Sequence, residues 1–191
     1  MATAERLIES TRALLWERGY AGTSPKAIQQ RAGVGVGSMY HHFDGKSGLA
    51  LAAMERSARE LRESAEDHFT GPGTAAERIA GYLLRERDVL SGCPVGRLSM
   101  DSEVVAEDRL RAPLDSLFGW LRIRLSELVA EGQRAGELDA GLDPRAVGAT
   151  IVAVVQGGYV VSRSAESPEP FDAAVRGALQ LLGHRRPPPL R

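Results

Sequence analysis

The chain has 191 residues, of which 43% are hydrophobic and 26% charged, so its composition excludes a disordered or fibrous protein and suits one globular domain or two small ones. The single cysteine, Cys93, excludes an internal disulfide and offers no zinc-site spacing. The most apolar run, residues 151–155, is far shorter than a bilayer span, and the polar residues 1–12 predict no signal peptide and a cytoplasmic protein.

Helical periodicity predicts an all-α fold, with an N-terminal three-helix domain that contains a helix-turn-helix and a helical domain after it. In the first fifty residues, helices are expected over 3–18, 25–32 and 36–43. Ser24 is a favoured N-cap and Pro25 a favoured first helical residue, so this pair starts the second helix. Gly19, Gly33 and the Asp44-Gly45 turn are expected to end the three helices.

The remaining apolar stripes predict six further helices, over about 46–69, 74–90, 98–107, 113–134, 144–164 and 170–183. The helix over 144–164 is apolar nearly all round, which is typical of a helix buried on every side. The proline-rich residues 185–191 are expected to form a disordered tail. We therefore predict two domains, over 1–47 and 48–184, followed by this tail.

The stretch from Thr23 to Lys46 has the pattern of a helix-turn-helix. Gly33 can adopt the left-handed conformation that ends one helix sharply. Apolar residues are spaced so that the two helices pack together, namely Ala27, Ile28, Val34 and Met39. The second helix of such a pair enters the major groove of DNA. The net charge of the chain is −1, but residues 1–50 hold six Lys or Arg against four acids, which agrees weakly with DNA binding at this end.

The same stretch resembles the N-terminal domain of the TetR family of transcriptional regulators. The matching residues are Gly19-Tyr20, Thr23-Ser24, Ile28, Ala32-Gly33-Val34, Tyr40, Phe43 and Lys46. The resemblance implies an all-helical, dimeric protein, and most members of the family are repressors that a ligand releases from DNA. This chain has Gly35 and Val36 where the family commonly has Ser and a polar residue, and Ala27 and Gln29 replace an acidic residue and Ala.

The resemblance also implies the DNA-binding residues. Lys26, Tyr40, His42 and Lys46 match positions that contact the DNA backbone, and their side chains can donate to phosphate oxygens. Val36, Gly37, Ser38 and His41 occupy the positions nearest the base edges, and Ser24 at the helix start completes the set. Alternatively, Tyr40 and Phe43 are core residues and the two histidines are a solvated pair. For Phe43 we favour the core, for Lys46 phosphate contact, and for His41 both interpretations stay open.

The resemblance implies that residues 48–184 bind a small-molecule effector and form a dimer, and the apolar last two helices are expected to be the interface. The Gly92-Cys93-Pro94 segment resembles the LmrA/YxaF-like subgroup, whose ligands tend to be flat aromatic natural products. The candidate effector residues are Tyr82, Leu83, Leu90, Arg97, Met100, Phe118, Trp120, Leu121, Gln156 and Tyr159. Each of the apolar candidates is more often a core residue than part of a cavity wall, and Arg97 is equally a solvated surface residue. For Cys93 a small buried hydrophobe is favoured over a redox sensor.

The function that we predict is a DNA-binding regulator, a repressor that leaves a palindromic operator when an apolar or aromatic ligand binds. An activator, or a regulator without an effector, stays open, as does a scaffold with a vestigial DNA-binding head. An enzyme is disfavoured because the sequence has no HExxH, P-loop, G-x-S-x-G or Cys/His metal motif. We expect no cofactor, no metal ion and no membrane partner.

Overall fold

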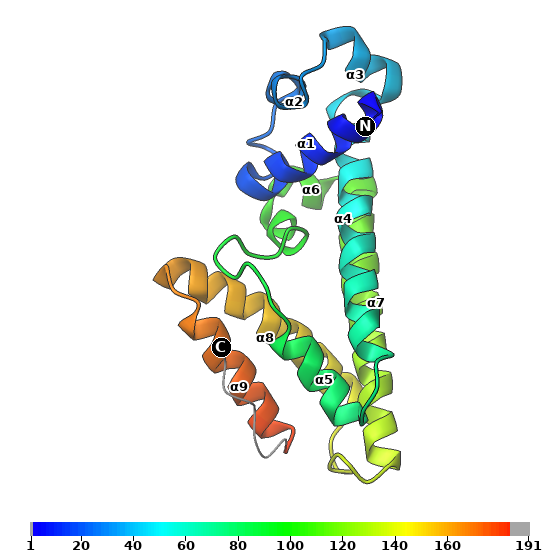
Figure 1. Ribbon diagram of the computed structural model, residues 1–191, viewed down its shortest axis with the longest axis vertical. Coiled ribbons are helices and arrows are strands. Elements are labelled where there is room, and N and C mark those ends of the chain that lie inside the picture. Colours follow the sequence, from blue (N-terminus) through cyan, green and yellow to red (C-terminus); the bar gives the residue numbers. More distant parts are fainter. Residues whose placement is uncertain (1, 184–191) are drawn as a thin grey trace. The chain divides into compact units, whose positions relative to one another are not determined.

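The protein is described here by a computed structural model of residues 2–183, and every element in that range is helical (Figure 1). The predicted all-α fold is confirmed. The elements are α1 (Thr3–Arg18), α2 (Pro25–Ala32), α3 (Val36–His42), α4 (Gly45–Phe69), α5 (Ala75–Leu84), the 3-10 helix η1 (Gly96–Met100), α6 (Ser102–Ala106), α7 (Asp108–Arg134), α8 (Pro144–Ala165) and α9 (Glu169–Leu181). The predicted tail, residues 185–191, lies outside the described residues.

Contacts divide the described chain into two compact units. The first contains residues 2–61 and 93–117, and the second contains residues 62–92 and 118–183. The division falls inside α4 and inside α7, so both long helices contribute to both units. The predicted boundary between residues 47 and 48 stays a prediction, because compactness does not show which segments fold by themselves.

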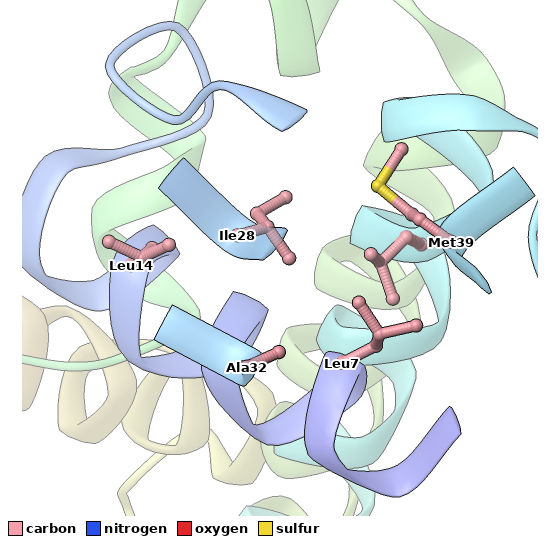
Figure 2. Packing of buried hydrophobic residues seen from close by; sticks show 6 residues of the cluster. Leu7, Leu14, Ile28, Ala32 and Met39 are labelled. Carbon is pink, nitrogen blue, oxygen red and sulfur yellow. The ribbon is translucent and has the colours of Figure 1, made fainter. Parts of the chain in front are cut away.

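In the first unit, α1, α2 and α3 pack around one small apolar core, and α4 contributes to it (Figure 2). Each core side chain is at most 6% exposed; the cluster consists of Leu7, Leu14, Ile28, Ala32, Met39 and Leu49. The sequence predicted Ile28 and Met39 in this role. Gly33 has φ 63° and ψ 42°, and its N–H donates to the carbonyl oxygens of Gln29 and Gln30. The expected left-handed turn between the two helices is confirmed.

The segment after residue 92 also belongs to the first unit. The Arg97 guanidinium donates to the carbonyl oxygen of Trp16 at 2.7 Å, near the C-terminal end of α1. The Asp101 carboxylate accepts from the N–H of Ala21 at 2.9 Å. Leu98 and Val104 are buried beside these polar contacts. The segment is therefore fixed to the end of α1 and to the turn that follows it.

The sequence predicted a single helix over 98–107, whereas the chain forms η1 and α6 there. The interruption is Asp101, whose backbone is extended at φ −88° and ψ 117°. Its side chain accepts from the N–H of Glu103 at 3.2 Å and so caps α6. The predicted single helix is wrong because one aspartate ends one helix and starts the next.

In the second unit, α8 and α9 pack against each other over much of their length (Figure 1). Gly158 allows this approach, because a Cβ there would lie 2.8 Å from the Phe171 ring. The Ser162 hydroxyl accepts from the N–H of Phe171 at 2.8 Å, which satisfies a donor in the first turn of α9. Gly158 thus permits close packing of α8 against α9, whereas Gly157 faces open space.

Helix α5 ends at Leu84, six residues before the predicted end at Leu90. Its start is as predicted, because Thr74 and Glu77 form a reciprocal capping box. At the other end, Arg85 has extended backbone, and the Arg87 side chain donates to the carbonyl oxygens of Tyr82 and Leu83. A side chain from outside the helix thus satisfies its last acceptors, and no glycine or proline marks the position in the sequence.

The sequence predicted that α8 is buried on every side, and for the single chain this is wrong. Ile151 and Val155 are buried, but Val160 is 66% exposed and Val161 is 55% exposed. Among the described residues, α8 is also the one helix long and apolar enough to cross a membrane, with a mean hydropathy of 1.3 and one third of the window buried. An apolar helix at a protein interface passes the same test, so this is weak evidence for a membrane.

Candidate DNA-binding surface and effector region

The outer face of α3 carries most of the predicted base-reading residues. Met39 is fully buried and anchors the helix, so the residues on its opposite face point to solvent. Val36 is 64% exposed and Tyr40 is 58% exposed, and Gly37, His41 and His42 are exposed as well. Ser38 is half-buried. The core alternative for Tyr40 is therefore wrong, whereas Phe43 packs against the core cluster as favoured.

Two predicted contact residues lie at the start of α2. The Ser24 hydroxyl accepts from the N–H of Ala27 at 3.2 Å, so it caps the helix. Lys26 in the first turn is exposed. By contrast, Gly35 at the start of α3 makes no side-chain cap hydrogen bond. Helix α3 therefore begins without the cap that a serine would supply.

Lys46 lies in the first turn of α4, with its Nζ 3.9 Å from the centroid of the Tyr20 ring. A cation over an aromatic face is attracted by the negative face of the ring. Tyr20 is itself buried, and burial raises the pKa of its hydroxyl. A buried ring in the first unit thus holds the ammonium group of Lys46 in a defined place.

The predicted effector residues do not gather at one place. Arg97 and Met100 belong to the first unit, where Arg97 contacts α1 and Met100 is 85% exposed. In the second unit, Tyr82, Leu83 and Leu121 are buried and Leu90 is 44% exposed. The half-buried candidates are Phe118, Trp120, Gln156 and Tyr159. Trp120 contacts Phe69, and Tyr159 contacts Phe171, at ring-centroid distances of 6.0 and 5.0 Å.

Sequence reasoning missed a group of basic side chains among these aromatic rings. The guanidinium carbon of Arg85 lies 4.5 Å from the Tyr82 ring centroid. That of Arg87 lies 5.4 Å from the rings of both Tyr82 and Phe171. Burial lowers the pKa of His68, and the charges of Arg85 and Arg87 lower it further. The signal in the sequence was the pair of arginines just after the apolar α5 stripe.

A separate groove of about 530 Å³ lies along α7 and α8, and none of the predicted effector residues lines it. Its lining consists of Gly119, Arg122, Ile123, Ser126, Glu127, Arg145 and Ala149.

Cys93 is 8% exposed, and its Sγ accepts from the N–H of Gly96 at 3.2 Å. Within residues 2–183, no group of three His, Cys, Asp or Glu side chains is placed to hold a metal ion.

An exposed second helix on a compact helix-turn-helix, joined to a larger helical unit, defines a DNA-binding regulator. The family model for bacterial regulatory proteins of the TetR family matches residues 7–53, and the model for the tetracyclin repressor-like C-terminal domain matches residues 75–178. The chain belongs to the TetR family of transcriptional regulators, whose members bind DNA, form dimers and respond to small-molecule effectors. The match does not confirm the LmrA/YxaF-like subgroup.

Individual relatives agree with this assignment. The chain is 28% identical over 169 residues to the transcriptional regulator AcuR of Cereibacter sphaeroides, which covers 85% of this chain and 77% of AcuR. It is similar to the crystal structure of the regulatory protein TetR from Rhodobacter sphaeroides, with a TM-score of 0.82, 26% identity and coverage of 92% and 96% of the two chains. The fold also matches FadR from Bacillus subtilis in complex with stearoyl-CoA, with a TM-score of 0.75, 19% identity and coverage of 93% and 96%.

Proposed function

We propose that this regulator is a homodimeric repressor that leaves a palindromic operator when a small organic effector binds in its second unit. The observation that carries the proposal is the exposed α3 face, where Val36 and Tyr40 project from a helix anchored by Met39. Two such faces related by a two-fold axis would meet two half-sites of a palindrome. The crystal structure of FadR in complex with stearoyl-CoA supports the idea that this fold accommodates an organic ligand.

The DNA contacts follow from the exposed side chains. Val36 cannot hydrogen-bond, so it would contact a thymine methyl, while His41 reaches a base edge. Lys26, Tyr40, His42 and Lys46 would donate to phosphate oxygens and fix the register of the helix, and Ser24, Gly37 and Ser38 would lie close to the same strands. Tyr82, Trp120, Gln156 and Tyr159 remain our candidates for effector contact, together with the other residues proposed from the sequence.

The dimer would bury the exposed face of α8 that carries Val160 and Val161. An apolar face of this kind is rarely left in water. We place the protein in the cytoplasm on the same reasoning, because a second copy covers α8 without a membrane. Enzyme activity is not part of the proposal, since the family consists of regulators.

The test is a titration of the purified protein against its own upstream DNA, with random DNA as the control, at about 50 and about 200 mM salt. We expect tight binding that exceeds binding to random DNA and that weakens steeply with salt. Equal, weak binding to both DNAs would contradict a local operator and would direct attention to the missing cap at Gly35.

A further inference from the structure

The second unit contains guanidinium groups that no acidic side chain neutralises. Arg85 and Arg87 follow α5 directly, and across residues 2–183 neither has a carboxylate oxygen within 4.0 Å of its nitrogens. In the same unit, Arg78 pairs with Glu131, and Arg124 pairs with Glu66 and Glu127. The two arginines beside Tyr82 therefore differ from Arg78 and Arg124 in having no acidic partner among the described residues.

Both of these arginines also carry a buried N–H donor without an acceptor. Within the described part of the chain, Arg85 NH1 and Arg87 Nε are shielded from solvent and make no hydrogen bond. A buried N–H donor of a charged group destabilises the folded state when it has no acceptor, so such donors are rare in protein interiors. The arrangement points to an acceptor that the chain itself does not provide.

The two arginines have different local roles. NH1 of Arg87 donates to the carbonyl oxygens of Leu83 and Arg85, at 2.7 and 2.9 Å, and NH2 donates to that of Tyr82 at 2.5 Å. Arg87 thus caps α5 and has only Nε left over. Arg85 makes a cation–π contact with Tyr82, and its NH1 is still without an acceptor. Arg85 is therefore the group with most capacity left for a ligand.

The surroundings suit an organic anion. The rings of Phe69, Tyr82 and Phe171 adjoin the arginines, and Tyr82 and Phe171 are nearly fully buried. The nearby titratable groups are Tyr82, Tyr159 and His68, and the pKa of His68 is lowered by burial and by the two guanidinium charges. Asp67 acts on His68 in the opposite direction but is exposed. A negatively charged group beside Tyr82 would therefore have positive charges and aromatic rings as neighbours.

We propose that the effector of this regulator carries a carboxylate group, which Arg85 binds beside Tyr82 with the free Nε–H of Arg87 as a second donor. A carboxylate offers two acceptor oxygens and one negative charge, which match two donors on fixed side chains better than a dianion does. The inference rests on the proposed function, because it names the chemical class of the effector for that same second unit.

The first test needs no ligand and uses the full chain. Because Arg85 is half-buried with an unsatisfied buried N–H and no carboxylate partner, Arg85→Met removes an unfavourable polar group and raises the Tm by about 2–4 °C. Arg134→Met, at an exposed position in the last turn of α7, is the matched control and leaves the Tm unchanged. A fall in Tm for Arg85→Met would show that Arg85 is a structural residue and would overturn the inference.

The second test measures binding by calorimetry with acetate, hexanoate, benzoate and 2-naphthoate, each compared with its neutral amide, and with phenyl phosphate. We expect at least one acid to bind roughly tenfold more tightly than its amide, Arg85→Met to lose this preference, and Arg85→Lys to keep part of it. If no acid exceeds its amide, or if phenyl phosphate binds best, the carboxylate assignment is wrong.

Operator release distinguishes this inference from the proposed function. An acid that binds through Arg85 and does not release DNA supports the carboxylate site and contradicts the release mechanism. Release by neutral compounds, with no response to any acid of the panel, supports the release mechanism and overturns the carboxylate site.

Discussion

The phosphate contact that we propose for Lys46 depends on a neighbouring side chain, that of Tyr20. Its ammonium group lies over the buried ring of Tyr20, which limits the positions that a flexible four-carbon side chain can take. A cation held in place loses less conformational freedom when it meets a phosphate. The Gly-Tyr pair that the sequence shares with the TetR pattern thus has a physical reason in the neighbouring helix.

We expect Lys46→Ala to weaken binding to operator and random DNA by a similar factor, because a phosphate contact carries no sequence information. The slope of log K against log salt should become shallower by about one, since one fewer counterion is released. Measurement by fluorescence anisotropy at four salt concentrations checks this, with Arg134→Ala in the second unit as the control. A loss confined to the operator, with the slope unchanged, would assign Lys46 to base recognition instead.

Residues in the helix-turn-helix were predictable from sequence because their positions follow from local chemistry. Ser24, Pro25 and Gly33 each fix a helix end by capping or by φ, and these positions are as expected. The exposure of Tyr40 was not predictable in the same way, because Tyr40 and Phe43 are both aromatic and only the packing around Met39 separates them. Arg85 and Arg87 were missed because an uncompensated charge is visible only when the neighbours are known.

At the scale of elements, the predicted helix ends were wrong where a polar side chain outside a helix satisfies the backbone groups at its end. The stop of α5 comes from Arg87, and the break between η1 and α6 comes from Asp101. Neither residue is a glycine or a proline, so the apolar periodicity continued past both points. By contrast, the bounds of α1, α2 and α8 follow closely from caps and periodicity.

Asp101 joins two elements of the first unit and is therefore a sensitive position. One carboxylate oxygen accepts from Ala21 after α1, and the other accepts from Glu103 in α6. We expect Asp101→Ala to lower the free energy of unfolding by about 1–2 kcal/mol, because the cap of α6 and the hydrogen bond from Ala21 are lost together. Urea denaturation followed by circular dichroism measures this.

Glu103→Ala is the matched control, because this neighbouring acidic residue is exposed and provides only its backbone N–H to the cap. It should change the free energy of unfolding by no more than about 0.5 kcal/mol. An equal effect of the two substitutions would mean that general charge, and not the two hydrogen bonds of Asp101, stabilises the segment.

At the scale of the whole molecule, the two family matches and the two compact units divide the chain differently. The C-terminal match includes residues 93–117, but this segment packs with the helix-turn-helix. Arg97 and Asp101 attach it to the end of α1. Because the chain returns to the first unit after α5, no single position in the sequence divides the two compact units.

A second feature of the whole molecule is the exposed side of α8, which the sequence predicted to be buried. Its apolar residues surround the helix, yet α9 and the rest of the chain cover only the side of Ile151 and Val155. A second copy of the chain would cover Val160 and Val161 and would make the original expectation correct for the dimer. The amino-acid pattern thus describes the assembly that we propose better than it describes one chain.

We expect Val160→Asp combined with Val161→Asp to separate the proposed dimer, because two carboxylates would lose water in an apolar interface. Analytical ultracentrifugation should give a dimer for the original chain and a monomer for the variant at micromolar concentration. Affinity for a palindromic operator should fall at least roughly tenfold, about 1.4 kcal/mol, since each half-site is then bound alone.

Val105→Asp, which changes a 43% exposed valine of α6 in the first unit, is the control and should stay dimeric. A doubly substituted protein that remains a dimer would move the interface away from this face of α8, and the exposed valines would then need another partner.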